Sequence, residues 1–147
     1  LEHPHVLYLA LLLHDVGKLV IRREILFKPG RLDPSEWAEM RRHSEYGEKI
    51  IKPVHGFGEV AEIVRHHHEK MDGSGYPDGL KGDQVSQFVR IVSVADSFEA
   101  LISDRTYRPA FTRDQALEIL HKETDEGHWD PQVVAVLSTS LDDLDNL

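Results

Sequence analysis

The chain of 147 residues contains no cysteine. This absence excludes a disulfide scaffold, a zinc site with thiolate ligands and catalysis by a thiol. Long apolar runs are also missing, because the longest covers only residues 6–13 and a bilayer-spanning helix needs roughly 20 residues. No secretory signal is recognisable. We therefore expect a cytoplasmic protein whose chain has no membrane span.

Positive charge is scarce, since 17 Lys and Arg residues face 26 Asp and Glu residues and the formal net charge is −9. A polymeric nucleic acid is not expected as a partner, because phosphate backbones demand clustered cations. Any phosphorylated ligand must instead be held by a local positive centre. Ten histidines accompany the many carboxylates. A metal site is therefore one candidate for this centre, because imidazole and carboxylate ligands suit iron, manganese, zinc or nickel.

Helical periodicity dominates the sequence, and no segment alternates convincingly like a β-strand. With 40% apolar residues, the chain is expected to form one all-α domain over residues 1–147. The glycine-rich segment 71–84 is expected to be an irregular loop between the third and fourth helices, and 141–147 a frayed C-terminus. The expected helices cover residues 6–16, a stretch that follows Asp33, residues 57–69, 86–103 and 114–123, and a short segment that opens at Asp130 and Pro131.

Two of the expected helices begin with capping signals. Asp33 is followed three residues later by Glu36, and Thr112 is followed at the same spacing by Gln115. Both pairs are typical of a capping box. The first helix is apolar on nearly all sides, which predicts a central, buried position, and Gly17 is expected to end it.

Several ionisable residues occupy positions that helical spacing assigns to buried faces. In the third helix, His67 and His68 continue the inward apolar stripe. In the second helix, His43 lies three residues after Met40 and four before Gly47, so it also points inward. The residues expected on the inner faces of the second and fourth helices are Trp37, Met40, Gly47, Ile51, Phe88, Val92, Ala95, Glu99 and Ile102.

Two carboxylates and one further histidine follow the same rule. Asp96 lies beside the stripe of the fourth helix, and His14 and Asp15 end the first helix with Lys18 on the same side. A single inward histidine is more often a hydrogen-bonded core residue than a ligand. Six inward ionisable side chains would each need a separate partner, however, whereas one shared metal centre satisfies them all. Both interpretations stay open from the spacing alone.

The chain also carries an ordered set of motifs: His14-Asp15-Val16-Gly17-Lys18, His43 with Gly47, His67-His68-Glu69, Asp72-Gly73-Ser74-Gly75-Tyr76-Pro77 with Gly79-Leu80, Arg90-Ile91-Val92, Asp96, Ala100-Leu101, Arg105-Thr106-Tyr107-Arg108 and Asp130-Pro131. Over residues 11–135 this set resembles the HD-GYP family, a subgroup of the HD-domain metal-dependent phosphohydrolases. The resemblance implies a helical bundle of HD-domain type. It also implies a bacterial phosphodiesterase that hydrolyses cyclic di-GMP, or a related cyclic dinucleotide, in second-messenger signalling, giving pGpG and, after a second round, GMP.

The same resemblance implies a centre of two or three divalent metal ions, with iron favoured and manganese, zinc or nickel as alternatives. The catalytic residues that it implies are Asp15, which would bridge two ions, and Lys18, which would lie near the reacting phosphate. The implied metal ligands are His14, Asp15, His43, His67, His68 and Asp96. The implied substrate-binding residues are Lys18, Tyr76, Arg105 and Arg108.

One feature departs from the family pattern. Family members draw further ligands from a helix upstream of the His-Asp pair, whereas only 13 residues precede His14 here, so we expect the upstream part of the domain to be absent. His3 and His5 are not expected to replace it, because nine helical residues between His5 and His14 span about 13.5 Å. We expect attachment to, or regulation by, a sensor or receiver domain, and a homodimer is compatible with the sequence.

Two alternative functions stay open. The chain could be a catalytically weak or inactive module that binds a cyclic dinucleotide or a protein partner, or a general HD phosphohydrolase acting on nucleotides. The loop around Tyr76, together with Arg105 and Arg108, argues against the second alternative. Without the resemblance, Arg105 and Arg108 would be interpreted as solvated residues that pair with Asp104 and the helix C-terminus.

Overall fold

The computed structural model describes residues 3–105 and 108–145 of the chain. The elements, in chain order, are α1 (Pro4–Leu13), the 3₁₀ helix η1 (Val16–Val20), α2 (Arg23–Leu26), α3 (Pro34–Arg41), α4 (His43–Ile51), α5 (Gly58–His66), the 3₁₀ helix η2 (Gly82–Gln84), α6 (Gln87–Ile102), α7 (Arg113–Asp125) and α8 (Pro131–Asp145). Every regular element within the described ranges is therefore a helix. The predicted all-α class is confirmed, and so is the irregular loop between α5 and α6.

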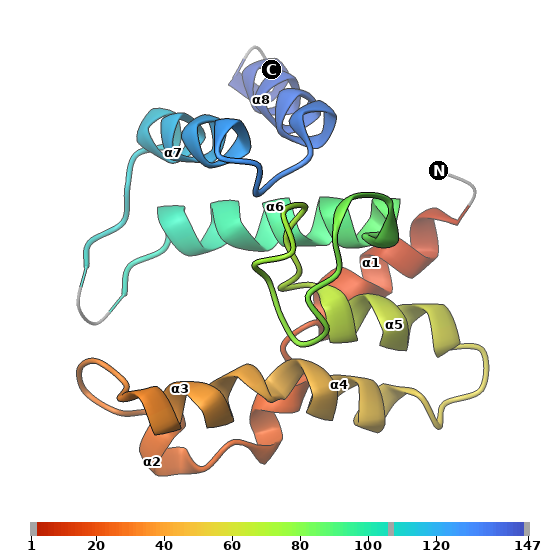
Figure 1. Cartoon of the computed structure of the whole chain (residues 1–147). Coiled ribbons are helices and arrows are strands. Elements are labelled where there is room, and N and C mark those ends of the chain that lie inside the picture. Colours follow the sequence, from red (N-terminus) through yellow and green to blue (C-terminus); the bar gives the residue numbers. More distant parts are fainter. Residues whose placement is uncertain (1–2, 106–107, 146–147) are drawn as a thin grey trace.

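Helix α6 runs through the middle of the molecule (Figure 1). Helices α7 and α8 pack on one side of it, and α1 and α5 pack against it from the other. Helix α4 in turn lies against α5 and η1. Two apolar cores result: α6 shares the first with α1, α4 and α5, and the second with α7 and α8.

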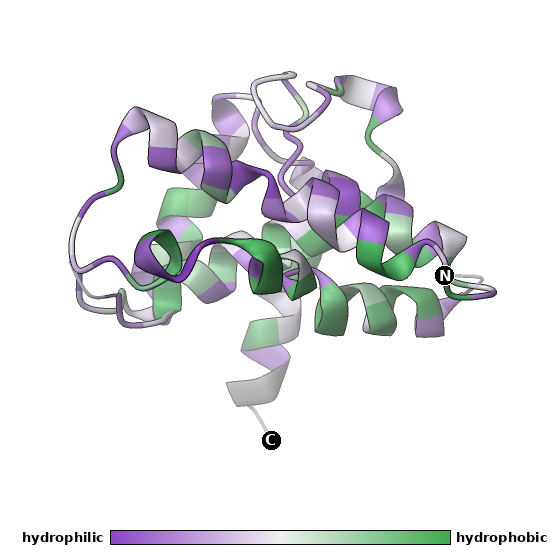
Figure 2. Ribbon diagram, turned by 90° about the horizontal axis from the view of Figure 1, so that it is seen from below, coloured by the Kyte–Doolittle hydropathy of each residue, from purple (hydrophilic) through white to green (hydrophobic). Residues whose placement is uncertain are grey.

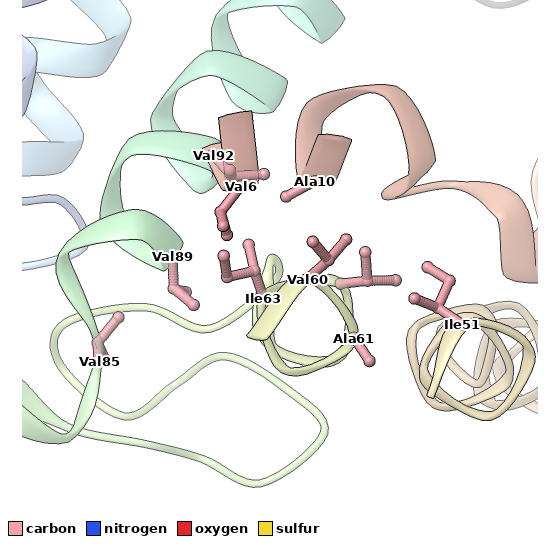
Figure 3. Packing of buried hydrophobic residues seen from close by; sticks show 10 residues of the cluster. Val6, Ala10, Ile51, Val60, Ala61, Ile63, Val85, Val89 and Val92 are labelled. Carbon is pink, nitrogen blue, oxygen red and sulfur yellow. The ribbon is translucent and has the colours of Figure 1, made fainter. Parts of the chain in front are cut away.

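The first core consists of aliphatic side chains whose close packing Figure 3 shows. Complete burial of one such side chain contributes about 1.5–3 kcal/mol. This core fixes the relative positions of the helices. The predicted metal ligands lie on these helices or directly after them. Its buried members are Val6, Ala10, Ile51, Val60, Ala61, Ile63, Val64, Val85, Val89 and Val92.

Both predicted capping boxes are present. The Asp33 carboxylate accepts a hydrogen bond from the backbone N–H of Glu36, whose side chain accepts one from the N–H of Asp33. Thr112 and Gln115 make the same reciprocal pair at the start of α7. Such caps stabilise a helix by about 0.5–2 kcal/mol each. The starts of α3 and α7 are thus determined locally.

The first helix ends at Leu13, earlier than predicted, and the chain then tightens into η1. Gly17 is therefore not a helix stop, and this prediction was wrong. It is buried, and a Cβ atom at this position would clash with the carbonyl oxygen of His43 and lie 2.5 Å from the amide nitrogen of Gly47. Glycine is required here because η1 packs directly on the backbone of α4.

Helix α1 is less buried than its all-round apolar sequence predicted. Val6 and Ala10 enter the first core, but Tyr8 is 64% exposed and Leu12 63% exposed, and Leu19 in η1 is 82% exposed. In Figure 2, the ribbon of the helix beside the marked N-terminus is correspondingly coloured as hydrophobic over much of its length. Only one side of α1 meets other helices of the described chain. Within the described residues, none of the helices has the length and hydropathy needed to cross a membrane.

The second predicted helix is divided by a turn at Arg42 into α3 and α4. Gly47 and Ile51 are buried as predicted, but Trp37 is 48% exposed. The expectation for Trp37 was wrong because the residues of α3, all within the described part of the chain, belong to neither apolar core.

The other predicted helices differ mainly at their C-terminal ends. Helix α5 ends at His66, so His67 and His68 lie in the turn that follows it. Helix α6 matches its predicted range, but Glu99 and Ile102 are exposed rather than inward-facing, because the last turns of α6 extend past the first core.

Helix α8 is longer than the short segment that the sequence predicted. Residues 141–145, which were expected to be frayed, belong to it, and residues 146–147 lie outside the described chain. Leu137 and Leu141 pack against the second core, and this burial offsets the entropy that the ordered end loses.

Candidate metal centre

Four segments that are far apart in the chain bring ionisable side chains to one place. The set comprises His14 and Asp15 after α1, His43 at the start of α4, His67 and His68 after α5, and Asp96 in α6. These are the six ligands that the sequence motifs implied. The structure brings all six together, while their role as ligands stays a prediction.

Three histidine nitrogens lie at the centre of this group. The Nε2 atom of His43 is 3.4 Å from Nε2 of His67 and 3.1 Å from Nε2 of His68, and the three side chains each offer a ligand atom within 4.8 Å of the others. His43 and His67 are almost fully buried. Together these nitrogens can hold one metal ion.

The orientation of these rings is set by the local backbone. Nδ1 of His43 lies 2.7 Å from the carbonyl oxygen of Met40, and Nδ1 of His67 lies 2.7 Å from that of Val64. A carbonyl oxygen only accepts a hydrogen bond, so Nδ1 carries the ring proton and Nε2 presents a lone pair. Two such lone pairs facing each other repel unless a cation lies between them. The donor set therefore fits a divalent metal ion.

The two carboxylates extend the group toward His14. Nε2 of His14 lies 3.2 Å from Oδ1 of Asp96 and 3.6 Å from Oδ2 of Asp15, and the other oxygen of Asp15 lies 3.4 Å from Nε2 of His43. Asp15 thus faces two different imidazoles with its two oxygens. Asp96 also lies 4.0 Å from Nδ1 of His68.

Ionisation differs sharply between the two ends of the group. The hydrogen bond to Asp96 raises the pKa of His14 to about 9, against the opposing effect of burial. Burial alone would raise the pKa of Asp96, but the hydrogen bond from His14 and the neighbouring imidazoles lower it to about 2. Burial lowers the pKa of His67 to about 4 and that of His68 to about 2. His67 and His68 are therefore neutral near pH 7, as metal ligation requires.

Lys18 contacts the same group from η1. Its Nζ atom lies 2.6 Å from Oδ2 of Asp15, in the i, i+3 relation that the sequence predicted. The pair is partly exposed, so it is screened by solvent and adds little to folding stability. The pair matters because it holds the Lys18 ammonium group beside the Asp15 carboxylate.

The glycine-rich loop is attached to the fold by Glu69. This carboxylate is 1% exposed and accepts hydrogen bonds from the backbone N–H groups of Asp78, Gly79 and Leu80 at 2.7–3.1 Å. A Cβ atom on Gly75 would lie 2.5 Å from the backbone of residues 68–70, so the loop packs directly on the turn that carries His68. Sequence spacing gave no basis for this role of Glu69.

The loop places Tyr76 against the histidine group. Its ring stacks on His68 with the centroids 4.8 Å apart and an interplanar angle of 21°. The guanidinium carbon of Arg41 lies 5.2 Å from the centroid of the same Tyr76 ring. Arg41 could not be identified from the sequence, because an arginine on the exposed side of a helix carries no periodic signal.

A cavity of about 1150 Å³ opens over this group. Asp15, Lys18, Tyr76, Arg105 and Arg108 all border it, so the cavity gathers the predicted catalytic and substrate-binding residues. Seven of the 17 Lys and Arg residues line it against five of the 26 Asp and Glu residues. The cavity is thus enriched in cations although the whole chain is acidic, which favours an anionic ligand.

The two predicted arginines are held differently. Arg108 donates hydrogen bonds to the carbonyl oxygens of Ala100 and Leu101 at the end of α6, as the interpretation based on residues alone expected. Arg105 is exposed and lies 3.9 Å from a carboxylate oxygen of Glu99.

His3 and His5 are exposed and precede or begin α1, so they do not join the group of predicted metal ligands.

A family model described as HD domain matches residues 2–133. The chain is 42% identical over 132 residues to the 3'3'-cGAMP-specific phosphodiesterase 3 of Vibrio cholerae, an alignment that covers 90% of this chain and 28% of that protein. It is 40% identical over 138 residues to the cyclic di-GMP phosphodiesterase response regulator RpfG of Xanthomonas campestris, covering 92% and 36% respectively. The chain thus spans about a third of these curated relatives, and the resemblance predicted from its motifs is confirmed.

Solved structures share the fold. Bd1817, an HDG"Y"P protein from Bdellovibrio bacteriovorus, matches with a TM-score of 0.71 and 24% identity over 93% of this chain and 43% of that one. The cyclic GMP-AMP specific phosphodiesterase V-cGAP3 of V. cholerae matches with a TM-score of 0.68 and 20% identity over 94% and 38%. The predicted helical bundle of HD-domain type is confirmed by both.

Proposed function

The chain belongs to the HD domain family, and from this premise we propose that it hydrolyses a phosphodiester bond of a cyclic dinucleotide. The proposed substrate is cyclic di-GMP or a related cyclic dinucleotide, with linear pGpG and, after a second round, GMP as products. The relatives named for cyclic di-GMP and 3'3'-cGAMP support this class of substrate. The observation that carries the proposal is the convergence of six ionisable side chains, five of which border a cation-enriched cavity.

We propose that the site holds two or three divalent metal ions, with iron favoured and manganese, zinc or nickel as alternatives. When bound, such ions lower the pKa of a water molecule and neutralise the charge of phosphate oxygens. The residues that would hold them are His14, Asp15, His43, His67, His68 and Asp96.

Asp15 would supply ligand oxygens to both sides of the group. One of its oxygens lies 3.4 Å from Nε2 of His43 and the other 3.6 Å from Nε2 of His14. A single carboxylate can therefore contribute one oxygen to each side of the group. Lys18 holds this carboxylate in place through its hydrogen bond of 2.6 Å.

Lys18 is also the proposed proton donor. When a phosphodiester bond breaks, the leaving 3′ oxygen needs a proton, and a positioned side chain supplies it efficiently. The Lys18 ammonium group borders the cavity beside Asp15, so it is close to the place where a phosphate would contact the histidine group. The same charge helps to hold the substrate.

Regulation through attachment to a sensor or receiver domain is proposed on the same basis, since one relative is named a response regulator. Hydrolysis in this chain would then lower the concentration of the second messenger when the attached domain allows it.

The proposal is tested by anaerobic purification, loading with ferrous iron or manganese, and incubation with cyclic di-GMP, 3'3'-cGAMP and GTP. Chromatography is expected to show linear dinucleotide from one or both cyclic substrates. His67→Ala should abolish the reaction, and Glu62→Ala on the exposed side of α5 is the matched control. Preferential hydrolysis of GTP would contradict the proposal in favour of a general nucleotide phosphohydrolase. Binding without hydrolysis would contradict it in favour of a signalling module.

A further inference from the structure

Arg41, Tyr76 and His68 form a continuous series of contacts from the cavity to the histidine group. The guanidinium carbon of Arg41 lies 5.2 Å from the centroid of the Tyr76 ring, at a distance typical of a cation–π contact. Tyr76 stacks in turn on His68. Arg41 and Tyr76 both border the cavity. The Tyr76 ring therefore contacts both the Arg41 guanidinium group at the cavity and His68, a predicted metal ligand.

The charge of Arg41 is uncompensated within residues 3–105 and 108–145. No carboxylate of these residues lies at ion-pair distance from its guanidinium group, which makes no hydrogen bond with them. Two other cations of the cavity are paired, because Lys18 contacts Asp15 and Lys28 contacts Glu36, both at 2.6 Å. A guanidinium group presents donors in a planar fork that matches two oxygens of a phosphate.

The proposed substrate has a chemical need that this arrangement meets. A cyclic dinucleotide carries two phosphodiesters, and only one of them can lie at the histidine group during hydrolysis. The other phosphodiester remains charged and needs a cation some distance away. Arg41 is separated from the histidine group by the Tyr76 ring, so it lies beside the reacting position without occupying it.

We propose that Arg41 binds the second, non-reacting phosphodiester of the cyclic dinucleotide and that Tyr76 is a positioning residue that holds Arg41 over the cavity. This inference rests on the proposed function. It assigns Tyr76 the task of supporting Arg41 and His68 with its ring, in place of the direct substrate contact that the sequence resemblance implied.

The chain offers a matched control in the next residue. Arg42 also lies over a tyrosine ring, with its guanidinium carbon 4.9 Å from the centroid of Tyr46, but it does not border the cavity. Arg41→Met is expected to raise the KM for cyclic di-GMP about tenfold, with kcat within about twofold and metal content unchanged, because a charge-assisted contact is lost. Arg42→Met is expected to leave KM unchanged, and Arg41→Lys to raise it less than Arg41→Met does.

Tyr76 is tested by variants that separate its ring from its hydroxyl group. Tyr76→Phe keeps the ring and is expected to retain the wild-type KM, whereas Tyr76→Leu is expected to raise KM as much as Arg41→Met. The salt dependence of KM should be weaker in Arg41→Met than in the wild type, because one screened charge contact is missing. A merely structural role of Arg41 would not change this dependence.

Equilibrium binding of cyclic di-GMP is measured beside turnover, using the fluorescence of the chain's two tryptophans, Trp37 and Trp129, which both border the cavity. If the wild-type protein binds cyclic di-GMP without hydrolysing it, the proposed function is overturned. The affinities of Arg41→Met and Arg42→Met then still test whether Arg41 binds the dinucleotide. Wild-type protein that neither binds nor hydrolyses overturns both. Equal affinities of the two variants, or loss of metal in Arg41→Met, overturn the role of Arg41.

Discussion

The histidine wall consists of the six predicted ligands, five of which border the cavity, and its side chains are buried or partly buried. The arginine wall, made of Arg41, Arg105 and Arg108, is more exposed. On the histidine wall, a carbonyl oxygen orients each of three rings. On the arginine wall, Arg108 contacts carbonyl oxygens of α6, whereas Arg41 lies over the aromatic ring of Tyr76. Metal ligation requires fixed geometry, while a flexible, charged ligand is better met by side chains that can adjust.

The strongest test of the histidine wall is Asp15→Ala. Because Asp15 faces His14 on one side and His43 on the other, its loss should remove metal and turnover together. Metal per chain and pGpG release under reducing conditions measure both. Asp125→Ala, at an exposed position in α7, is the matched control. An Asp15→Ala variant that retains its metal and activity would show that the histidine wall does not form the proposed centre.

The second test addresses the packing beneath the histidine wall. Gly17→Ala should lower the free energy of unfolding by about 3 kcal/mol, because the new methyl group meets the backbone of α4, which cannot move aside cheaply. Gly58→Ala, where a Cβ atom has no neighbour within 4 Å, should be neutral or slightly stabilising. Urea titration measures both values. Equal stabilities of the two variants would mean that η1 and α4 are not in close contact.

The third test concerns the link between the two walls. Glu69→Gln replaces a buried carboxylate that accepts three backbone N–H groups, so at least one of these donors loses its partner. We expect a loss of about 2 kcal/mol in unfolding free energy, together with an increased KM because the loop that carries Tyr76 loosens. Glu62→Gln on the exposed side of α5 controls for the charge. An unchanged KM would show that the loop that carries Tyr76 does not contribute to substrate binding.

The fourth test compares two members of the arginine wall. Arg108→Met should lower the unfolding free energy by about 1 kcal/mol, because the carbonyl oxygens at the end of α6 lose a charged donor. Arg105→Met should change it by less than about 0.5 kcal/mol, because the side chain is exposed. Both variants should raise KM. A stability loss in Arg105→Met of the same size would contradict the distinction between them.

The smallest expected effect lies at Asp78, outside both walls. Hydrogen bonds from Arg65 at 2.8 and 2.9 Å, and a further one from His66, hold the pKa of the Asp78 carboxyl well below its usual value. The unfolded value is about 3.9, so the stabilisation is complete above that pH and is lost as pH falls through the lower folded value. Because Asp78 is partly exposed and screened, the contribution is about 1 kcal/mol or less.

Acid titration of the unfolding free energy measures this contribution. Asp78→Asn should flatten the fall in stability below pH 4, and Asp125→Asn in α7 is the control for removing one surface charge. If stability falls equally steeply in Asp78→Asn and in the wild type, the ion pair with Arg65 does not contribute.

Much of the histidine wall could be predicted from the sequence. Helical spacing aims His43 and His67 inward because i and i+4 positions share a face, and both lie in the buried group. The same rule failed for Trp37 and Glu99, which were predicted to face inward but are exposed. Spacing identifies a face of a helix, but it cannot say how far the neighbouring helix reaches.

The arginine wall was less accessible to sequence analysis. Arg41 contacts Tyr76 across a separation that no local pattern encodes, and Glu69 could not be assigned its task from its position in the motif. Helix α8 was underestimated for a similar reason, because Leu137 and Leu141 are stabilised by the second core rather than by local signals.

By itself the sequence determined the local features: the two capping boxes, the irregular glycine-rich loop, and the spacing that turns histidines and aspartates to the inner faces of helices. These depend on hydrogen bonds and steric constraints within a few residues of one another. Only the tertiary structure decided that three Nε2 atoms face each other, that Gly17 is a packing position, and that Arg41 lies over Tyr76. Such contacts join distant segments, and the packing of whole helices on a shared core selects them.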